Sequence, residues 1–497
     1  MSRTVALILA AVLLSVLAAP SAYAVTPYSG YVYDHKDNPV PSLNGYVYLD
    51  SIDGYDGQSG PFKAPQHLFV AADDSLYVVD SGNNRVVHLS GDNRLLRVFG
   101  TDEGEGKLNS PKGVFVTDDG TVYVADTKNS RIAVFDPAGK FVRDYRDPKN
   151  PLLGDKFQFV PSKLVVDKRG YMFVVVDGLY QGLMQLDPNG EFAGFFGANH
   201  VPFSVTRIIT RLIATKEQKA QMATEKPPEF SNLFQDRDGF IYTTTLGIDT
   251  LQTKRLSAVG VDTLNAQESA LGRYGDTRFR VITDSKGKQQ ERKHVFVSVT
   301  VDNQGFITVL DQMTGKAFQY DSLGNLLFVF GGIGSQDGLM ITPSSIAVNS
   351  KGVIYIADET RNRIDRFRTT EFGDLVHRAS VLYSDGLYEQ SKEPWMDVLK
   401  RNSNYNLAYL AIGKALYKQE QYKEAMEYFK TARSYREYSL AYLEHRKNYM
   451  REHFVWFVAG VILFAIVFRM FLGWRRRRKL RLNKQFYAVR RTEGGAP

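Results

Sequence analysis

The sequence predicts a mainly β fold, a β-propeller of six blades that is followed by helical hairpins and a single transmembrane helix. Three observations predict this fold. A pattern of short apolar runs and polar turns, clearest in Val114–Phe135, recurs along the chain. The pattern becomes helical near Asp374, and Phe454–Trp474 is apolar apart from Arg469. Apolar runs separated by tight turns are typical of antiparallel strands, and an internal repeat decides the architecture before any single motif does.

The composition narrows the classes of function. The chain has 497 residues, which exceeds one ordinary domain unless that domain is a large closed β array. It contains no cysteine, so disulfides, thiolate metal sites and cysteine nucleophiles are excluded. The formal net charge of +8 comes in part from a basic cluster within residues 475–497, and it therefore does not predict nucleic-acid binding.

Residues 1–24 have the pattern of a secretory signal peptide. Arg3 gives a charged start, Val5–Leu17 is an apolar run too short to span a bilayer, and Ala22 and Ala24 form a small-x-small cleavage site. An uncleaved anchor is the less favoured alternative. The mature chain is therefore expected to begin at Val25, outside the cytoplasm.

Six turn residues mark the repeat in the predicted propeller, residues 25–370. Each follows the first strand of a unit: Asp74, Gly120, Gly170, Gly239, Gly305 and Gly352. Three of the five intervals between them are 46 to 50 residues (74 to 120, 120 to 170 and 305 to 352), the length of a four-stranded blade. Asp119 and Gly120 are expected to form a two-residue hairpin turn, because Gly supplies a positive φ.

The two longer intervals require insertions. One has a helical pattern and occupies residues 203–226, and the other, near Gln267–Gln290, is predicted as a long polar loop. The units there match the repeat least, so the blade count is six, or five if one of them is not a blade. Near the N-terminus, Gly30–Tyr33 and Gly45–Leu49 are predicted as short strands that complete the last blade and remove its open edge.

Most units end their second strand in a carboxylate, six residues after the turn residue. These carboxylates are Asp80, Asp126, Asp311 and Asp358. Thr245 replaces the carboxylate in the fourth unit, and Asp177 is displaced by one position in the third. An arginine follows five residues later in three units: Arg85, Arg131 and Arg363.

The segments Tyr77–Arg85, Tyr123–Arg131 and Tyr355–Arg363 resemble the NHL repeat of six-bladed propellers. The Asp/Arg pairs within them have two interpretations. In the structural one, each Asp accepts hydrogen bonds from turn amides and pairs with its Arg within one blade. In the functional one, the pairs form a ring of charges that binds a ligand. Repetition at equivalent positions favours the structural interpretation, and no pair is expected to be catalytic.

A second set of positions lies seven residues before each turn residue, where the first strand enters near the central channel. It comprises His67, Gly113, Lys163, Asn232, Ser298 and Ser345. Different side chains at equivalent positions are what a ligand-binding channel mouth requires, so His67, Lys163, Asn232, Ser298 and Ser345 are candidate ligand-binding residues. The alternative is a solvated rim with no ligand.

Metal catalysis is the alternative function. Propeller lactonases and amidating lyases resemble this architecture and use a central Ca or Zn. A zinc site needs about three converging ligands, but only His67 occupies the ring position. A calcium site needs six or more oxygen ligands, and the ring supplies no carboxylate. We therefore expect no catalytic residue, no metal and no cofactor, and a metal-dependent hydrolase or lyase stays the alternative.

Basic residues give the predicted inserted helix a charged side; they are Arg207, Arg211, Lys216 and Lys219. This side is interpreted as a surface for the membrane or an acidic partner, or more simply as a solvated face.

Residues 374–450 are predicted to be helical and resemble tetratricopeptide repeats. The residues that carry this resemblance are Tyr409, Ile412, Gly413, Leu416, Ala425, Phe429 and Ala432. A poorer copy, with Ala379, Trp395 and Val398, comes before it. Two such hairpins are few for a free-standing array, so they are expected to lean on the propeller, on a partner or on each other across a dimer.

Residues 454–474 are predicted to span the membrane, with the basic tail 475–497 in the cytoplasm. The alternative is a buried core helix. With the signal peptide, this gives a single-pass membrane protein whose bulk is extracellular.

The order of segments also resembles bacterial membrane-anchored NHL proteins found with carbohydrate ABC transporters. The shared stretches are Asn232–Leu233, Asp238–Tyr242, Asn402–Leu416 and Ala425–Ala432. The resemblance implies a protein or glycan partner, such as a component of an ABC transporter or another envelope complex. We therefore expect a membrane-anchored, non-enzymatic binding protein. A spacer without a partner is a third class.

Overall fold

A computed structural model describes residues 26–493, except 37, 56–58, 200–226, 249, 265–273, 277–279, 284–288 and 293. The predicted signal peptide (1–24) and the predicted helical insertion (203–226) lie outside the described residues. The chain divides after Ala408 into two compact units.

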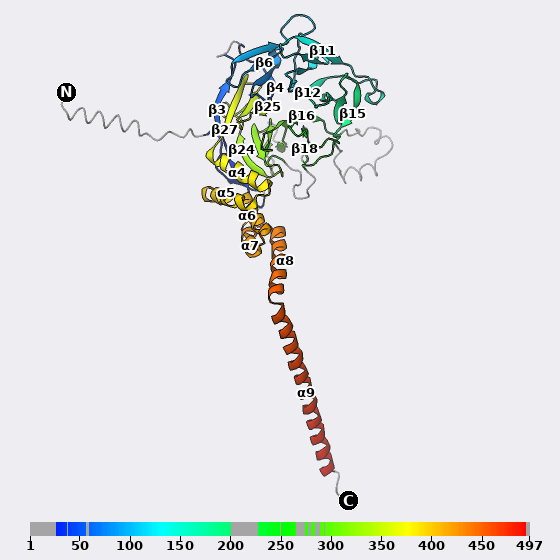
Figure 1. Ribbon diagram of the computed structural model, residues 1–497, viewed down its shortest axis with the longest axis vertical. Coiled ribbons are helices and arrows are strands. Elements are labelled where there is room, and N and C mark those ends of the chain that lie inside the picture. The colour runs from blue at the N-terminus through cyan, green and yellow to red at the C-terminus, as the bar shows by residue number, and fades with distance from the viewer. Residues whose placement is uncertain are drawn as a thin grey trace, which may run out of the picture. The chain divides into compact units, whose positions relative to one another are not determined.

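The first unit contains a six-bladed β-propeller, which confirms the predicted fold class (Figure 1). Blade 1 consists of β4 (Pro65–Val70), β5 (Leu76–Asp80), β6 (Arg85–Leu89) and β7 (Leu95–Phe99). Blade 2 consists of β8 (Gly113–Val116), β9 (Val122–Asp126), β10 (Arg131–Phe135) and β11 (Phe141–Arg146). Blade 3 consists of β12 (Pro161–Val166), β13 (Met172–Val176), β14 (Leu183–Leu186) and β15 (Phe192–Phe196). Short 3₁₀ turns follow β5 (Ser81–Asn83), β9 (Thr127–Asn129) and β11 (Pro151–Leu153).

The other three blades are less uniform. Blade 4 has β16 (Phe230–Gln235), β17 (Ile241–Thr245) and β18 (Thr253–Leu256) within the described residues. Blade 5 consists of β21 (Phe296–Val301), β22 (Ile307–Asp311), β23 (Lys316–Tyr320) and β24 (Leu326–Gly331). Blade 6 consists of β25 (Pro343–Val348), β26 (Ile354–Asp358), β27 (Arg363–Thr369) and the N-terminal strand β3 (Tyr46–Ile52).

β3 closes the ring, because it pairs antiparallel with β27 as the outermost strand of blade 6. The prediction that Gly45–Leu49 completes the last blade is therefore confirmed. The other predicted strand, β1 (Tyr31–Tyr33), pairs instead with β2 (Pro39–Pro41) in a separate hairpin. Apolar clusters fill the spaces between neighbouring blades, and the one between blades 6 and 1 joins Ile364 and Ala347 to Leu68 and Val78. Burial between the blades supplies the main stabilisation of the ring.

The six turn residues of the repeat share one backbone conformation. Their φ angles lie between +64° and +86°, in the left-handed region that favours glycine. Five of the six residues are glycine, and the sixth is Asp74. The carboxylate oxygens of Asp74 accept hydrogen bonds from Ser350 N (2.7 Å) and Ser350 Oγ (2.6 Å) in blade 6. These bonds join the first blade to the last.

Two local predictions were wrong. The turn around Gly120 spans residues 117–121 and is closed by Thr117 N to Thr121 O, so it is longer than a two-residue hairpin. Part of the predicted polar loop forms a two-stranded hairpin of β19 (Arg280–Thr283) and β20 (Gln289–Arg292). The alternation of apolar and polar residues that predicts a strand is weak in this polar segment, so the sequence pattern indicates a loop there.

Two helices of the first unit pack against the propeller. α4 (Glu371–Ser384) begins directly after β27, with the Thr370 hydroxyl as its N-cap, and α5 (Tyr388–Arg401) packs against it. Tyr405 Oη donates to Leu327 O in β24 (2.9 Å), and Trp395 is buried. The first hairpin therefore leans on the propeller, as one of the expected alternatives states.

The second unit is helical. α6 (Asn406–Lys418), which begins at the end of the first unit, forms a hairpin with α7 (Tyr422–Thr431). A Cβ on Gly413 would lie 2.7 Å from Phe429 Cδ1, so the small residue permits the close approach that the tetratricopeptide-like pattern predicts. α8 (Tyr435–Glu452) and α9 (Phe454–Glu493) follow. In the part of the chain that the structure describes, the segment Phe454–Lys484 is long and apolar enough to cross a membrane.

Candidate ligand-binding channel

A cavity of about 1380 Å³ runs along the centre of the propeller, and all six inner strands contribute to its wall. These strands are β4, β8, β12, β16, β21 and β25. At one end, the turn end, the cavity is bordered by the turns between the first two strands of each blade, with exposed Asp118, Lys168, Arg237 and Asn303. The opposite, buried end lies at the ring positions predicted from the sequence. Each inner strand pairs along one side only, so its other edge faces the channel.

The ring residues are buried at this end of the channel, not placed at a solvated rim. His67 is 8% exposed, Ser345 is 0% exposed, and the others lie in this range. Three of them make the same kind of contact: each side chain accepts a hydrogen bond from a main-chain N–H in the inner strand of the next blade. The bonds are Val114 N to His67 Nδ1 (3.2 Å), Ile346 N to Ser298 Oγ (3.2 Å) and Leu68 N to Ser345 Oγ (3.0 Å). Asn232 Nδ2 donates to Ser298 Oγ (3.4 Å).

Lys163 crosses between blades. Its Nζ donates to Gln66 O in blade 1 (2.8 Å) and to Lys112 O beside blade 2 (2.5 Å). Burial, and next the charge of Lys112, lower the pKa of Lys163 from its usual 10.5 to about 7. Gly113 makes room for this arrangement, because a Cβ there would lie 2.5 Å from Ser162 O and 3.0 Å from Lys163 Cα.

His67 is neutral near pH 7. Burial, and next the nearby Lys163, hold its pKa well below the usual 6.5. Since Nδ1 accepts from Val114 N, the neutral ring carries its proton on Nε2. His67 is the ring residue that also contributes to the cavity wall. The structure thus brings the five candidate ligand-binding residues together at one level of the channel. Whether they bind a ligand stays a prediction.

The predicted Asp/Arg pairs are present in blades 1 and 2. Arg85 Nε lies 2.7 Å from Asp80 Oδ2, and Arg131 Nε lies 2.7 Å from Asp126 Oδ2. Both carboxylates are fully buried and also accept a main-chain N–H from the segment before their inner strand, Lys63 N and Asn109 N. These contacts lie within one blade, away from the channel wall, and they match the structural interpretation.

The prediction was wrong for blade 6. Arg363 pairs with Asp365 (2.7 Å) and Asp337 (2.8 Å), not with Asp358. Asp358 is still buried, and it accepts main-chain N–H groups from Ile341 and Thr342. Asp365 lies two residues along the same strand, on the side that Arg363 faces, so it competes successfully for the guanidinium.

A histidine replaces the arginine in blade 5. His294 Nδ1 lies 2.7 Å from Asp311 Oδ2. Burial opposes the charge on His294, but the Asp311 carboxylate outweighs burial and raises the pKa of the imidazole above 6.5. His294 precedes its Asp by 17 residues, so a search for an Arg five residues after the Asp misses it.

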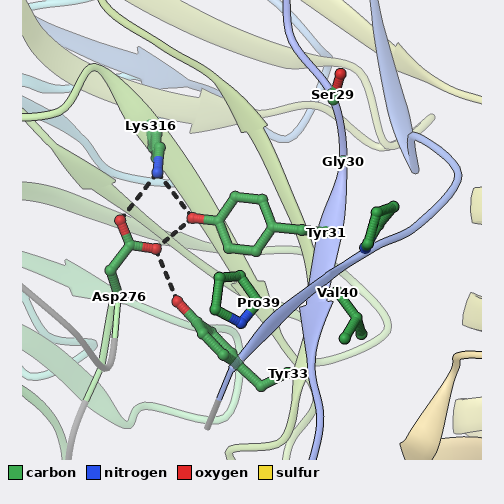
Figure 2. Close-up of a pocket in the computed structure, with 9 residues that line it drawn as sticks. Ser29, Gly30, Tyr31, Tyr33, Pro39, Val40, Asp276 and Lys316 are labelled. Carbon is green, nitrogen blue, oxygen red and sulfur yellow. Dashed lines mark hydrogen bonds and ion pairs between the residues drawn. The ribbon is translucent and has the colours of Figure 1, made fainter.

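A second cavity of about 380 Å³ lies beside the β1–β2 hairpin. Figure 2 shows its polar cluster, in which Tyr31 and Tyr33 point toward Asp276. Lys316 Nζ lies 2.9 Å from Asp276 Oδ2 and 2.8 Å from Tyr31 Oη. Burial, and next Asp276, raise the pKa of Tyr31, which keeps its phenol protonated. These groups satisfy one another, so the cluster fastens the hairpin to blade 5. Among the described residues, no group of three or more His, Asp or Glu side chains is arranged to hold a metal.

Comparison with known proteins identifies an NHL repeat in blade 2, since the NHL repeat family model matches residues 108–135. No curated protein matches the chain. Virginiamycin B lyase from Staphylococcus aureus, in selenomethionine-substituted form, is similar at 12% identity and a TM-score of 0.40, over 65% of this chain and 99% of that one. A protein of unknown function from Bacteroides thetaiotaomicron is similar at 14% identity and a TM-score of 0.40, over 67% and 80%. Similarity at this level does not transfer a lyase activity to this chain.

Proposed function

We propose that the protein is a membrane-anchored, non-enzymatic binding protein whose propeller channel takes up a ligand outside the cytoplasm. The observation that supports this most is the cavity of about 1380 Å³, to which the inner strands of all six blades contribute. Ligand sites are typically concave and largely preformed, with a few converging polar groups. At its buried end the channel has such a group in His67, and the buried Lys163 lies close enough for its charge to act on that imidazole.

The membrane anchor in this proposal is the span within α9. The segment Phe454–Lys484 has the required length and apolar character, and the basic residues after Trp474 favour the cytoplasmic side. The helical hairpins offer a surface to a protein or glycan partner, and the resemblance stated above suggests a component of a carbohydrate ABC transporter. No nucleic acid takes part.

Single cysteines test the membrane orientation, because the chain has none of its own. Glu103, whose side chain is 95% exposed in the propeller, and Arg478, in the basic tail, are replaced one at a time by cysteine. In sealed right-side-out membrane vesicles, we expect an impermeant maleimide to label Glu103→Cys at once. Arg478→Cys should be labelled only after the vesicles are permeabilised. The reverse pattern, or equal labelling of both, would contradict the proposal.

The same chemistry tests the channel. Asn303 is exposed and lines the turn end, so Asn303→Cys carrying a bulky polyethylene glycol maleimide obstructs entry. The protein in vesicles is incubated with a low-molecular-mass extract of the producing cells, washed, and analysed by mass spectrometry. We expect the unlabelled protein to retain a compound whose mass is unchanged. Blocked Asn303→Cys should retain at least tenfold less of this compound than the unlabelled protein does. Blocked Glu103→Cys is the control. Retention that is insensitive to the block would refute the channel site, and conversion of the compound would refute a non-enzymatic role.

A further inference from the structure

A buried lysine without an ion-pair partner among the described residues lies beside His67 at the buried end of the channel. Lys163 is 7% exposed, and its Nζ contacts two main-chain carbonyls. Within the described residues, no carboxylate oxygen forms an ion pair with it. The carboxylate of Asp177 favours the charged form of Lys163 only from a distance, because it is paired with neighbouring Lys112 at 2.8 Å. Burying an ammonium group without a direct ion pair is costly, and two carbonyl dipoles and a more distant carboxylate compensate only part of the cost. A methionine would fill the space without that cost, so packing does not account for the charge.

His67 supplies a second donor at the same level. Its Nδ1 is occupied by Val114 N, which leaves the Nε2 proton of a neutral ring for other acceptors, and the residue lines the cavity. Among the described residues, no acceptor is found for Nε2. An ammonium and an imidazole N–H are complementary to a carboxylate.

The wall toward the turn end offers main-chain groups. Leu68 N, Val114 N and Ile346 N point to the channel edge of their strands, since each bonds to a ring side chain of the neighbouring blade. N–H and C=O groups alternate between the two edges of a strand, so the next residues on the same edge are Val70, Val116 and Val348. All three line the cavity, and a ligand rich in hydroxyl groups can both donate to and accept from such an edge.

We propose that the channel binds a polyhydroxylated carboxylate, a sugar acid, with its carboxylate at His67, beside the positive charge of Lys163, and its hydroxyl groups along the channel edges of the inner strands. This inference rests on the proposed function and specifies the ligand class of the same channel. Because the pKa of Lys163 is lowered to about 7, part of its amino group is neutral near pH 7.5, and a bound carboxylate raises this pKa again, so binding takes up a proton.

The probes are D-glucuronate, its uncharged isostere D-glucuronamide, and cyclohexanecarboxylate, which keeps a six-membered ring and the charge but lacks the hydroxyl groups. Binding to the full-length protein in zwitterionic nanodiscs is measured by calorimetry in two buffers of different ionisation enthalpy. We expect wild-type protein to bind D-glucuronate at least tenfold more tightly than either other probe, with proton uptake at pH 7.5.

Lys163→Met should remove the preference for D-glucuronate over D-glucuronamide and abolish the proton uptake. Lys112→Met, which removes an exposed lysine paired with Asp177, should keep the preference for D-glucuronate but reduce the proton uptake, because the charge of Lys112 helps to lower the pKa of Lys163. If Lys163→Met does not fold, the affinities of the wild-type protein for the three probes and its proton uptake still test the sugar-acid inference. Equal affinity for D-glucuronate and D-glucuronamide, or no binding of D-glucuronate, would overturn the sugar-acid inference. The retention experiment with blocked Asn303→Cys would then judge the channel function separately.

Discussion

Arg131→Met is expected to lower the free energy of unfolding of the propeller by about 3–5 kcal/mol. The variant leaves Asp126, which is fully buried, without the guanidinium 2.7 Å away. It also removes the contacts of Arg131 with Asp144 (2.9 Å) and Lys107 O (2.8 Å). Methionine keeps most of the side-chain volume, so the loss reports mainly an uncompensated buried charge. Chemical denaturation of the full-length protein, followed by circular dichroism in the β region, measures the change.

Arg169→Met is the matched control. Arg169 pairs with Asp167 at 2.7 Å, but its side chain is 70% exposed, so solvent screens the pair and the expected change is much smaller than for Arg131→Met. The double variant Asp126→Asn with Arg131→Met should be less destabilised than Arg131→Met alone, because the charge is removed with its partner. Equal effects of Arg131→Met and Arg169→Met would show that burial does not set the strength of these pairs.

The pairs in blades 1 and 2 could be predicted because their partners are close in the chain. Asp126 ends one strand, Arg131 begins the next, and the hairpin brings them face to face in register. The same spacing in blade 6 led to a wrong partner. Asp337 approaches Arg363 from a loop that precedes the blade, and a repeat pattern contains no information about such a residue. The spacing of two residues along the chain therefore predicts their contact only where no carboxylate from another segment competes for the arginine.

The level of the ring residues in the channel could also be predicted, since a fixed distance from a turn residue places each on the same row of its inner strand. Their hydrogen bonds could not. Leu68 N bonds to Ser345, which lies 277 residues further along the chain, and the partner is a main-chain group that any sequence provides. The two residues come into contact only because the closed ring places the inner strands of blades 1 and 6 side by side. The sequence pattern therefore predicts a channel mouth or a rim, whereas the residues lie at the buried end.

His377 is expected to make the docking of α4 sensitive to acid. The imidazole is 7% exposed, its Nε2 lies 2.6 Å from Gln319 Oε1 in β23, and it stacks on Phe306 with ring centroids 4.2 Å apart. Burial lowers the pKa of His377 from 6.5 to about 4, and Asp374 opposes this only in part. The unfolded chain therefore binds more protons between these values. The contribution of His377 is complete above pH 6.5 and falls by about 3 kcal/mol as the pH drops toward 4.

Two buried carboxyl groups act in the opposite direction, so the wild-type curve alone cannot show the effect of His377. Burial raises the pKa of Asp302 and of Asp365 from 3.8 to about 6, and both therefore reduce stability as the pH rises through this range. The comparison needed is wild type against His377→Gln, which keeps a donor for Gln319 and does not titrate. Between pH 7 and pH 4.5, wild type should lose stability relative to His377→Gln, whereas Asp302→Asn should shift the curve the other way. Parallel curves for wild type and His377→Gln would show that the imidazole is not buried at this contact. The attachment of α4 to blade 5 would then have to rest on the ring contact of Phe372 with Phe328 and on the hydrogen bond of Tyr405 to Leu327 O.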